Sequence, residues 1–240
     1  MTALVVPRRF NGPPASANGG YVAGALAEAS GLDGDVTVQL RKPPPLEQPL
    51  SVVTADGQVE LRDGDDVVAV ATAEAPASWT DALPVTLAVA RSLEESYVGH
   101  RHHPFPTCFS CGPQRDDGLR IFPGRVDDLR VAASWTPADD LAGPGGHVDR
   151  PVTWAALDCV GGWSSDLEHR PMVLASMAAR VGSPPQAGAP YVVVGTMVRS
   201  EGRKTWTAST MFDTDGQVVA QAEHLWIAVD WAVVQHLQGR

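Results

Sequence analysis

Residues Pro151 to Trp163, PVTWAALDCVGGW, decide the fold of this chain, because they form an apolar run in which Asp158 is the one charged residue. A proline fits the first turn of a helix, where its missing N–H is not needed. Asp149 stands two residues earlier as a cap acceptor. Since the run lacks a polar face, it predicts a helix buried on most sides. Trp154, Leu157 and Asp158 are expected to share one face of it.

A second stretch, Gly19 to Ser30 (GGYVAGALAEAS), has the same character. It is rich in alanine and carries one charge, Glu28, and Gly31 follows it as a stop signal. The loop in front of it is rich in Gly, Pro and Asn and ends at Asn18. The stretch therefore predicts a second buried helix that begins at a polar, glycine-rich turn.

Each predicted helix is followed by strand-like segments, several of them separated by Asp-Gly turns. The first helix precedes Val36–Leu40, Leu50–Thr54, Gln58–Leu61 and Val67–Ala73, and the second precedes Met172–Val181, Tyr191–Arg199, Lys204–Phe212 and Val218–Val229. Leu4–Val6 and Leu129–Trp135 are expected to be strands before the helices, and Leu83–Leu93 a short helix or an extended connector. Both halves thus read as a helix followed by an antiparallel meander.

The two halves also share a short string near their last strands. Val67–Ala71 (VVAVA) and Val218–Ala222 (VVAQA) agree at four of five positions. Together with the repeated order of elements, this indicates a duplicated unit of about 110 residues. We expect one module over residues 1–95, an irregular linker over 96–125, and a second module over 126–240.

The composition excludes several classes of protein. A net charge of −10 over 240 residues argues against nucleic-acid binding, which needs a basic surface. The sequence has no run of eighteen apolar residues, so no membrane span is predicted. The first ten residues lack the features of a signal peptide. Three cysteines do not make a disulfide framework, so a reducing cytoplasm is the expected compartment.

These features resemble the hotdog-fold thioesterase superfamily in its double-hotdog arrangement. The resemblance is carried by the Asn18-Gly19-Gly20 turn that enters Tyr21–Ala29, and by Gly146-His147 leading to the Ala155–Asp158 segment. The stretches HPFPTCFSCGPQR and DGLRIFPG are similar to a segment of uncharacterised thioesterase-like actinobacterial proteins. The resemblance implies an α+β fold, a double hotdog in which two long central helices are each wrapped by antiparallel strands that form one continuous sheet.

The resemblance also implies a site, because hotdog enzymes commonly combine a carboxylate and a helix N-terminus from facing helices. Asp158 would attack a thioester or activate water, and Asn18 or the Gly20 N–H would polarise its carbonyl. Substrate contacts are expected from Gly19, Tyr21, His147 and Trp154. A mirror pairing would set Glu28 against the turn at His147, although a solvated helix-terminal charge is the favoured interpretation of Glu28.

The leading functional prediction is an acyl-CoA thioesterase-like hydrolase whose partner is an acyl-CoA thioester, with a homodimer left open. Asp158 could instead cap a backbone group or pair with an arginine. One alternative function is a non-catalytic acyl-binding protein, and another is a double-hotdog enoyl-CoA hydratase, although a Gly-Asp-x-Asn-Pro-like core is missing. Basic residues that could meet the phosphates of CoA are Arg8, Arg9, Arg41, Lys42, Arg101, Arg199, Arg203 and Lys204.

The spacing of Cys108 and Cys111 forms half of a zinc-ribbon signature. Four ligands would be needed, and His100, His102, His103 and the distant Cys159 could contribute. Two reduced thiols in a tight turn are the favoured interpretation, so neither a metal nor a cofactor is expected. Cys159 follows Asp158 and is expected to point elsewhere on the helix, into the core.

Overall fold

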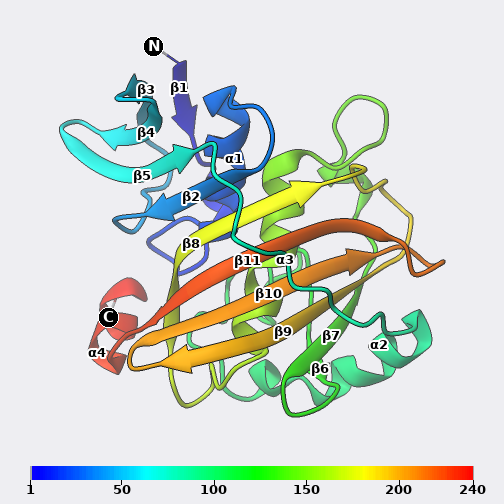
Figure 1. The fold of residues 1–240 in the computed structure, drawn as a ribbon. Helices are drawn as coiled ribbons and strands as arrows, with labels where there is room; N and C mark the ends of the chain where they lie inside the picture. The colour runs from blue at the N-terminus through cyan, green and yellow to red at the C-terminus, as the bar shows by residue number, and fades with distance from the viewer. Residues whose placement is uncertain (1, 240) are drawn as a thin grey trace.

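The computed structural model describes residues 2–239, and an antiparallel sheet of eleven strands runs through this part of the chain (Figure 1). The strands are β1 (Thr2–Val5), β2 (Val36–Leu40), β3 (Pro49–Ala55), β4 (Gln58–Asp63), β5 (Asp66–Thr72), β6 (Gly124–Arg125), β7 (Arg130–Trp135), β8 (Met172–Val181), β9 (Tyr191–Glu201), β10 (Lys204–Phe212) and β11 (Val218–Ala228). The helices are α1 (Gly19–Ser30), α2 (Leu87–Leu93), α3 (Arg150–Trp163) and α4 (Trp231–Leu237), with short 3-10 turns at Arg8–Phe10, Glu94–Ser96, Val98–His100 and Asp139–Leu141.

The order of the strands shows the duplication. Across the sheet it is β1-β3-β4-β5-β2-β8-β11-β10-β9-β7-β6. In each half, the first strand after the long helix pairs with the fourth, the fourth with the third, the third with the second, and the second with the strand that precedes the helix. The halves are therefore mirror images in strand order about the β2–β8 pair, and the repeated string lies in the equivalent strands β5 and β11.

The two halves share one sheet because β2 and β8 pair directly. Val36 lies opposite Ala179, and the antiparallel register continues to Gln39 opposite Ser176. This junction confirms the double-hotdog prediction of one continuous antiparallel sheet around two central helices. The boundaries of the modules stay a prediction, and β6 lies inside the segment that we expected to be an irregular linker.

Helices α1 and α3 lie against each other on one face of this sheet. Gly20 of α1 faces Asp158 and Trp154, whereas Gly24, one turn later, faces the earlier residues Pro151 and Trp154, so the helices run antiparallel. A Cβ atom at Gly20 would lie 2.5 Å from the Asp158 Cβ, and one at Gly24 would lie 2.8 Å from the Pro151 Cα. The two glycines therefore permit the close approach of the helices.

The stretch between β5 and α2, residues 73–86, crosses the other face of the sheet (Figure 1). The guanidinium carbon of Arg180 in β8 lies 4.6 Å from the centroid of the Trp79 ring. The Thr80 backbone N–H donates a hydrogen bond to the Glu223 carboxylate of β11. The chain then forms α2 next to β7. The chain thus covers part of its own outer sheet face before it reaches the cysteine-rich stretch.

Most predicted elements agree with the structure within two residues, and α1, β2, β8 and β10 have the expected bounds. The cap of α3 was predicted wrongly: Asp149 occupies the N-cap position, but its side chain makes no capping hydrogen bond. Helix α4 was not predicted. None of the described helices is long and apolar enough to cross a membrane.

The contact between the helices leads to a prediction for stability. The Cβ atom that Gly24→Ala adds would lie 2.8 Å from the Pro151 Cα and 2.9 Å from two side-chain atoms of Trp154. Because overpacking a dense core typically costs about 1–3 kcal/mol, we expect this variant to lower the free energy of unfolding by about 2 kcal/mol despite the better helix propensity of alanine. Urea denaturation measures the change.

The matched control is Gly182→Ala, where the added Cβ meets its nearest atom at 3.5 Å on an exposed turn. We expect this variant to unfold within about 0.5 kcal/mol of the wild type. Equal stability of the two variants would contradict the proposed packing of α1 on α3.

Candidate active site between the two central helices

The carboxylate of Asp158 is held by the beginning of the facing helix. Its Oδ2 atom accepts hydrogen bonds from Asn18 Nδ2 and from the Gly20 backbone N–H, each at 3.0 Å. The Asn18 Oδ1 atom accepts from the Tyr21 N–H at 2.8 Å and so caps α1. The structure thus brings together the three residues that the sequence predicted to act together, one from the second module and two from the first.

Burial governs the charge of this carboxyl group. Asp158 is 2% exposed, and its Oδ1 atom has no hydrogen-bond partner among the described residues. Desolvation raises the pKa of Asp158 from its ordinary value to about 7, against the hydrogen bonds from Gly20 and Asn18, which lower it. A carboxyl group with this pKa can exchange a proton near neutral pH, which suits a general base.

Two hydrogen-bond donors at the start of α1 bind Asp158, and a third has no partner among the described residues. The Gly20 N–H and the Asn18 amide both bind Asp158, so in this structure neither is directed at a substrate carbonyl. The Gly19 N–H makes no hydrogen bond within residues 2–239, and Gly19 lines a cavity. A free N–H at a helix N-terminus favours a developing negative charge. Gly19, rather than Gly20, thus holds the available donor.

A cavity of about 470 Å³ lies beside this pair of helices. Its polar end contains Asn18, Gly19, Asp158 and the three cysteines. Its apolar wall is formed by Leu40, Leu167, Met172, Leu174, Trp226, Ile227, Val233 and Leu237. Because α4 contributes the last two of these residues, the helix that the sequence did not predict closes one side of the cavity. The volume and the apolar wall suit a small ligand with a hydrophobic part.

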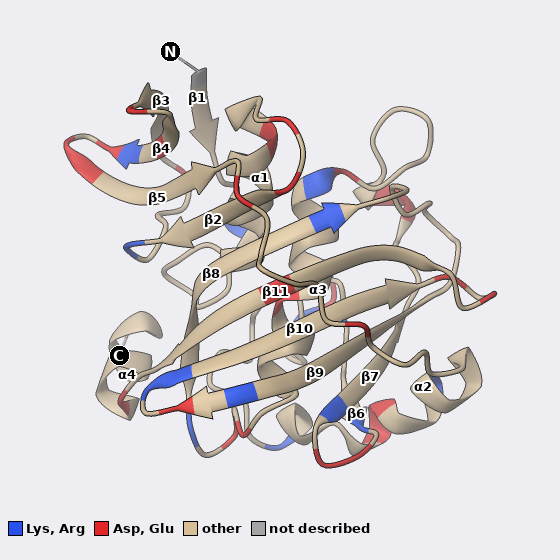
Figure 2. Cartoon of the chain, in the orientation of Figure 1, with Lys and Arg blue, Asp and Glu red and all other residues tan. Residues whose placement is uncertain are grey.

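Basic side chains lie at the same cavity. Arg41, Lys42 and Arg203 line it and are exposed. Figure 2 shows the basic residues at the end of β2 and at the turn between β9 and β10 on the same side of the molecule. In an acidic protein such a local positive rim can hold an anionic group. The structure thereby selects these three from the wider set of basic candidates in the sequence.

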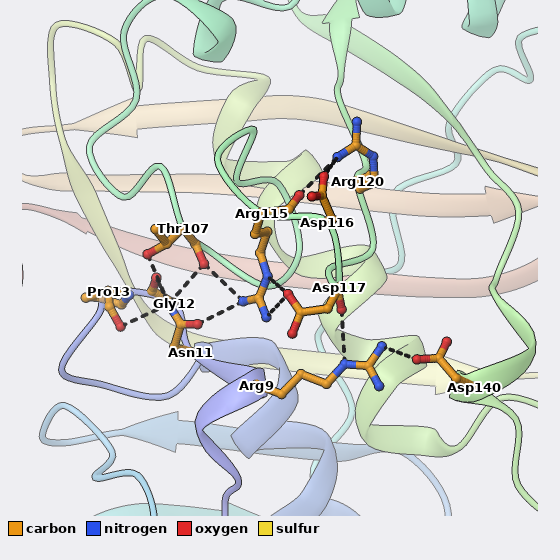
Figure 3. A network of polar contacts seen from close by, with 10 residues as sticks. All are labelled: Arg9, Asn11, Gly12, Pro13, Thr107, Arg115, Asp116, Asp117, Arg120 and Asp140. Atoms are coloured by element: carbon orange, nitrogen blue, oxygen red, sulfur yellow. Dashed lines mark hydrogen bonds and ion pairs between the residues drawn. The ribbon is translucent and has the colours of Figure 1, made fainter.

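A polar network fixes the loop that leads into α1 (Figure 3). The Arg115 guanidinium donates to Asn11 Oδ1 at 2.8 Å and to the Thr107 carbonyl at 3.0 Å, and it pairs with Asp117 at 2.7 Å. Arg9 donates to the Asp117 carbonyl and pairs with Asp140. The network ties the loop before Asn18 to the cysteine-bearing segment, which gives the start of α1 a defined position.

Three residues that were expected to contact substrate lie elsewhere. Tyr21 stacks on Phe10 with ring centroids 3.9 Å apart, and Trp154 is buried against Gly24. His147 is exposed, in an isolated bridge with Gln186. None of the three lines the cavity beside Asp158, so of the four predicted substrate contacts only Gly19 does.

The mirror pairing is not assembled either. Glu28 is exposed at the end of α1, where it lines a smaller pocket with Asp140 and Asp149. His147 is not among the residues that line this pocket. The two ends of the helix pair therefore differ: one has a buried carboxylate bound by the Gly20 N–H and the Asn18 amide, and the other has three acidic side chains near solvent.

The structure corrects the prediction for Cys159. We expected its side chain to point elsewhere on the helix, but its Sγ lies 3.7 Å from the Cys108 Sγ, and it lines the same cavity as Asp158. The sequence missed this contact because it depends on where the segment between the modules folds back onto α3.

Comparison with known proteins agrees with this architecture. No protein-family model matches the chain, and no curated protein matches it. A conserved protein of unknown function with a hot dog fold from Alicyclobacillus acidocaldarius is similar over 94% of this chain and 91% of its own, with a TM-score of 0.60 and 12% identity. The tesB protein of Mycobacterium avium subsp. paratuberculosis is similar over 91% and 89%, with a TM-score of 0.57 and 15% identity.

A thioesterase superfamily protein shares 27% identity over 58% of this chain and 72% of its own, with a TM-score of 0.46. At these identities the first two structures, which cover nearly the whole chain, establish the fold alone. The chain is a double-hotdog protein, and this fold by itself does not define an activity.

The raised pKa of Asp158 predicts a pH-dependent stability. Folding favours the protonated carboxyl, so this contribution is full below pH 4 and is lost as the pH rises through about 7. Asp158→Asn keeps an acceptor for Asn18 and Gly20 but does not ionise. We expect the unfolding free energy of the variant, relative to wild type, to increase by about 2 kcal/mol between pH 5 and pH 8.

Urea denaturation at the two pH values measures this difference. The control is Asp116→Asn, because Asp116 is fully exposed and its carboxylate pairs with Arg120 at the surface. A relative stability of Asp158→Asn that does not change with pH would show that Asp158 has an ordinary pKa.

Proposed function

We propose that this protein is a hydrolase of acyl-CoA thioesters, with Asp158 as the general base and the N-terminus of α1 as the site that stabilises the oxyanion. The observation that carries the proposal is the buried carboxylate from one module bound to the first turn of the helix of the other, at the polar end of an apolar cavity. Both groups that thioester hydrolysis needs are thereby held in one place.

In the proposed reaction, Asp158 Oδ1 takes a proton from a water molecule as the water oxygen bonds to the thioester carbonyl carbon. The carbonyl oxygen becomes an oxyanion, which the Gly19 N–H stabilises. The oxyanion then re-forms the carbonyl as the C–S bond breaks, and the carboxylic acid is released. The proton that Asp158 accepted passes to the leaving CoA sulfur, which restores the carboxylate and gives the free thiol. Asn18 and Gly20 are positioning groups in this scheme, because they hold the other carboxylate oxygen.

A second candidate function is acyl-CoA binding without hydrolysis. It is favoured by the use of two donors at the α1 turn to bind Asp158, which leaves one N–H for a substrate carbonyl. Ligand-dependent thermal stabilisation by acyl-CoA without release of free thiol would support this function.

The test of the proposed base is the Asp158→Asn variant. We expect it to lower kcat at least 100-fold, because an amide cannot accept the proton, while KM changes little. Free-thiol release from acyl-CoA thioesters of graded chain length is the measurement, made on folded protein as judged by circular dichroism.

Glu28→Gln is the matched control, since Glu28 is the equivalent acid of the first module and lies outside the cavity. It should retain wild-type turnover.

The wild-type kcat/KM should rise with pH through about 7 as Asp158 loses its proton. Unchanged turnover in Asp158→Asn would remove this residue from the mechanism.

The basic rim predicts where the nucleotide part of CoA binds. Replacing both Lys42 and Arg203 by Ala should raise KM for an acyl-CoA about tenfold and leave kcat unchanged, because phosphate contacts are remote from the reacting carbonyl. The same acyl group on pantetheine, which lacks the nucleotide, should show no change in KM. An equal rise with both substrates would place the nucleotide elsewhere.

A further inference from the structure

The three cysteines of the chain meet at one point, although they come from two distant segments. Cys108 and Cys111 belong to the segment between the modules, and Cys159 belongs to α3. Their Sγ atoms all lie within 4.8 Å of one another, and those of Cys108 and Cys159 are 3.7 Å apart. Three thiols gathered this closely in a protein interior are not explained by the proposed hydrolysis.

The separation of the sulfur atoms suits a shared metal ion. Three thiolates bound to one tetrahedral Zn²⁺ at roughly 2.3 Å would have S···S distances of about 3.8 Å. The Cys108–Cys159 distance already has this value, and a shift of about 1 Å or less brings the third sulfur to it. Thiolate is also the ligand type that favours zinc over the hard cations.

Several groups around the cluster are hydrogen-bond donors. Asn18 Nδ2 lies 3.7 Å from Cys108 Sγ and 3.9 Å from Cys159 Sγ. The Trp163 indole N–H is buried near Cys111 and has no acceptor at hydrogen-bonding distance among residues 2–239. Such donors stabilise anionic sulfur and are typical of the surroundings of metal-bound thiolates.

His103 is a further donor rather than a fourth ligand. Its Nδ1 atom accepts a hydrogen bond from the Phe105 N–H at 2.9 Å, so the proton of the neutral ring is on Nε2. Nε2 lies 3.3 Å from Cys111 Sγ and directs this proton at the sulfur.

The geometry points to a zinc site: Cys108, Cys111 and Cys159 bind one Zn²⁺ ion through their thiolates. Three S–H protons pass to solvent as three Zn–S bonds form. The fourth position falls to a water molecule, because all three cysteines line the cavity. The ion joins the segment between the modules to α3, one residue after Asp158. This inference does not depend on the proposed hydrolysis.

The test is metal analysis of the full chain, expressed with added zinc and purified in reducing buffer. We expect about one equivalent of zinc per chain. Replacement by Co²⁺ should give a thiolate-to-cobalt charge-transfer band and tetrahedral d–d bands. Before chelation the three thiols should resist alkylation, and after chelation all three should react.

Cys159→Ala should retain less than a tenth of the zinc. His103→Gln should retain the metal, as should the control His169→Ala, whose imidazole is exposed and pairs with Asp166. If Cys159→Ala does not fold, the cobalt spectrum and the alkylation of the wild type still decide the question. Zinc near zero after reconstitution, a Cys108–Cys159 disulfide in its place, or loss of metal in His103→Gln with retention in Cys159→Ala would overturn the three-thiolate site.

Discussion

The structure depends on the close contact between α1 and α3. Gly20 and Gly24 present no side chains to α3, so the backbones approach, and the Asp158 carboxylate reaches the Gly20 N–H. A carboxylate buried this deeply is unfavourable without partners. The hydrogen bonds from Asn18 and Gly20 reduce this cost, but the pKa of Asp158 still rises to about 7. The same packing therefore builds the core and creates a titratable group at a cavity.

Duplication supplies two equivalent helix ends, and the chain uses them differently. In the strand order, β2 and β8 form the centre and the two halves mirror each other. At one end of the helix pair, Asn18, Gly19 and Gly20 meet Asp158 beside an apolar wall. At the other end, Glu28 is exposed near two further acids, and His147 is bound in a bridge with Gln186. The added segments, α4 and the linker, enclose only the first end.

The segment between the modules does more than connect them. The stretch that precedes it, residues 73–86, crosses the outer face of the sheet, and the segment itself brings Cys108 and Cys111 to α3. The Arg115 network fixes this cysteine-bearing segment to the loop that precedes α1. One continuous set of contacts consequently holds the start of α1, the Asp158 carboxylate and the thiols. A substitution in the linker should therefore alter the positions of the residues that line the cavity.

The sequence by itself determined the architecture, because it depends on local patterns. An apolar run with a single acid, a second alanine-rich run, and two sets of strand-like segments predicted two halves, each a buried helix followed by an antiparallel meander. The double hotdog and the pairing of Asp158 with Asn18 and Gly20 were implied by the resemblance of these motifs to the hotdog-fold superfamily. The tertiary structure alone decided which donors remain free, that Tyr21, Trp154 and His147 lie outside the cavity, and that Cys159 meets Cys108. These features depend on the path of irregular segments and on the packing of α4, which hydrophobic periodicity does not encode.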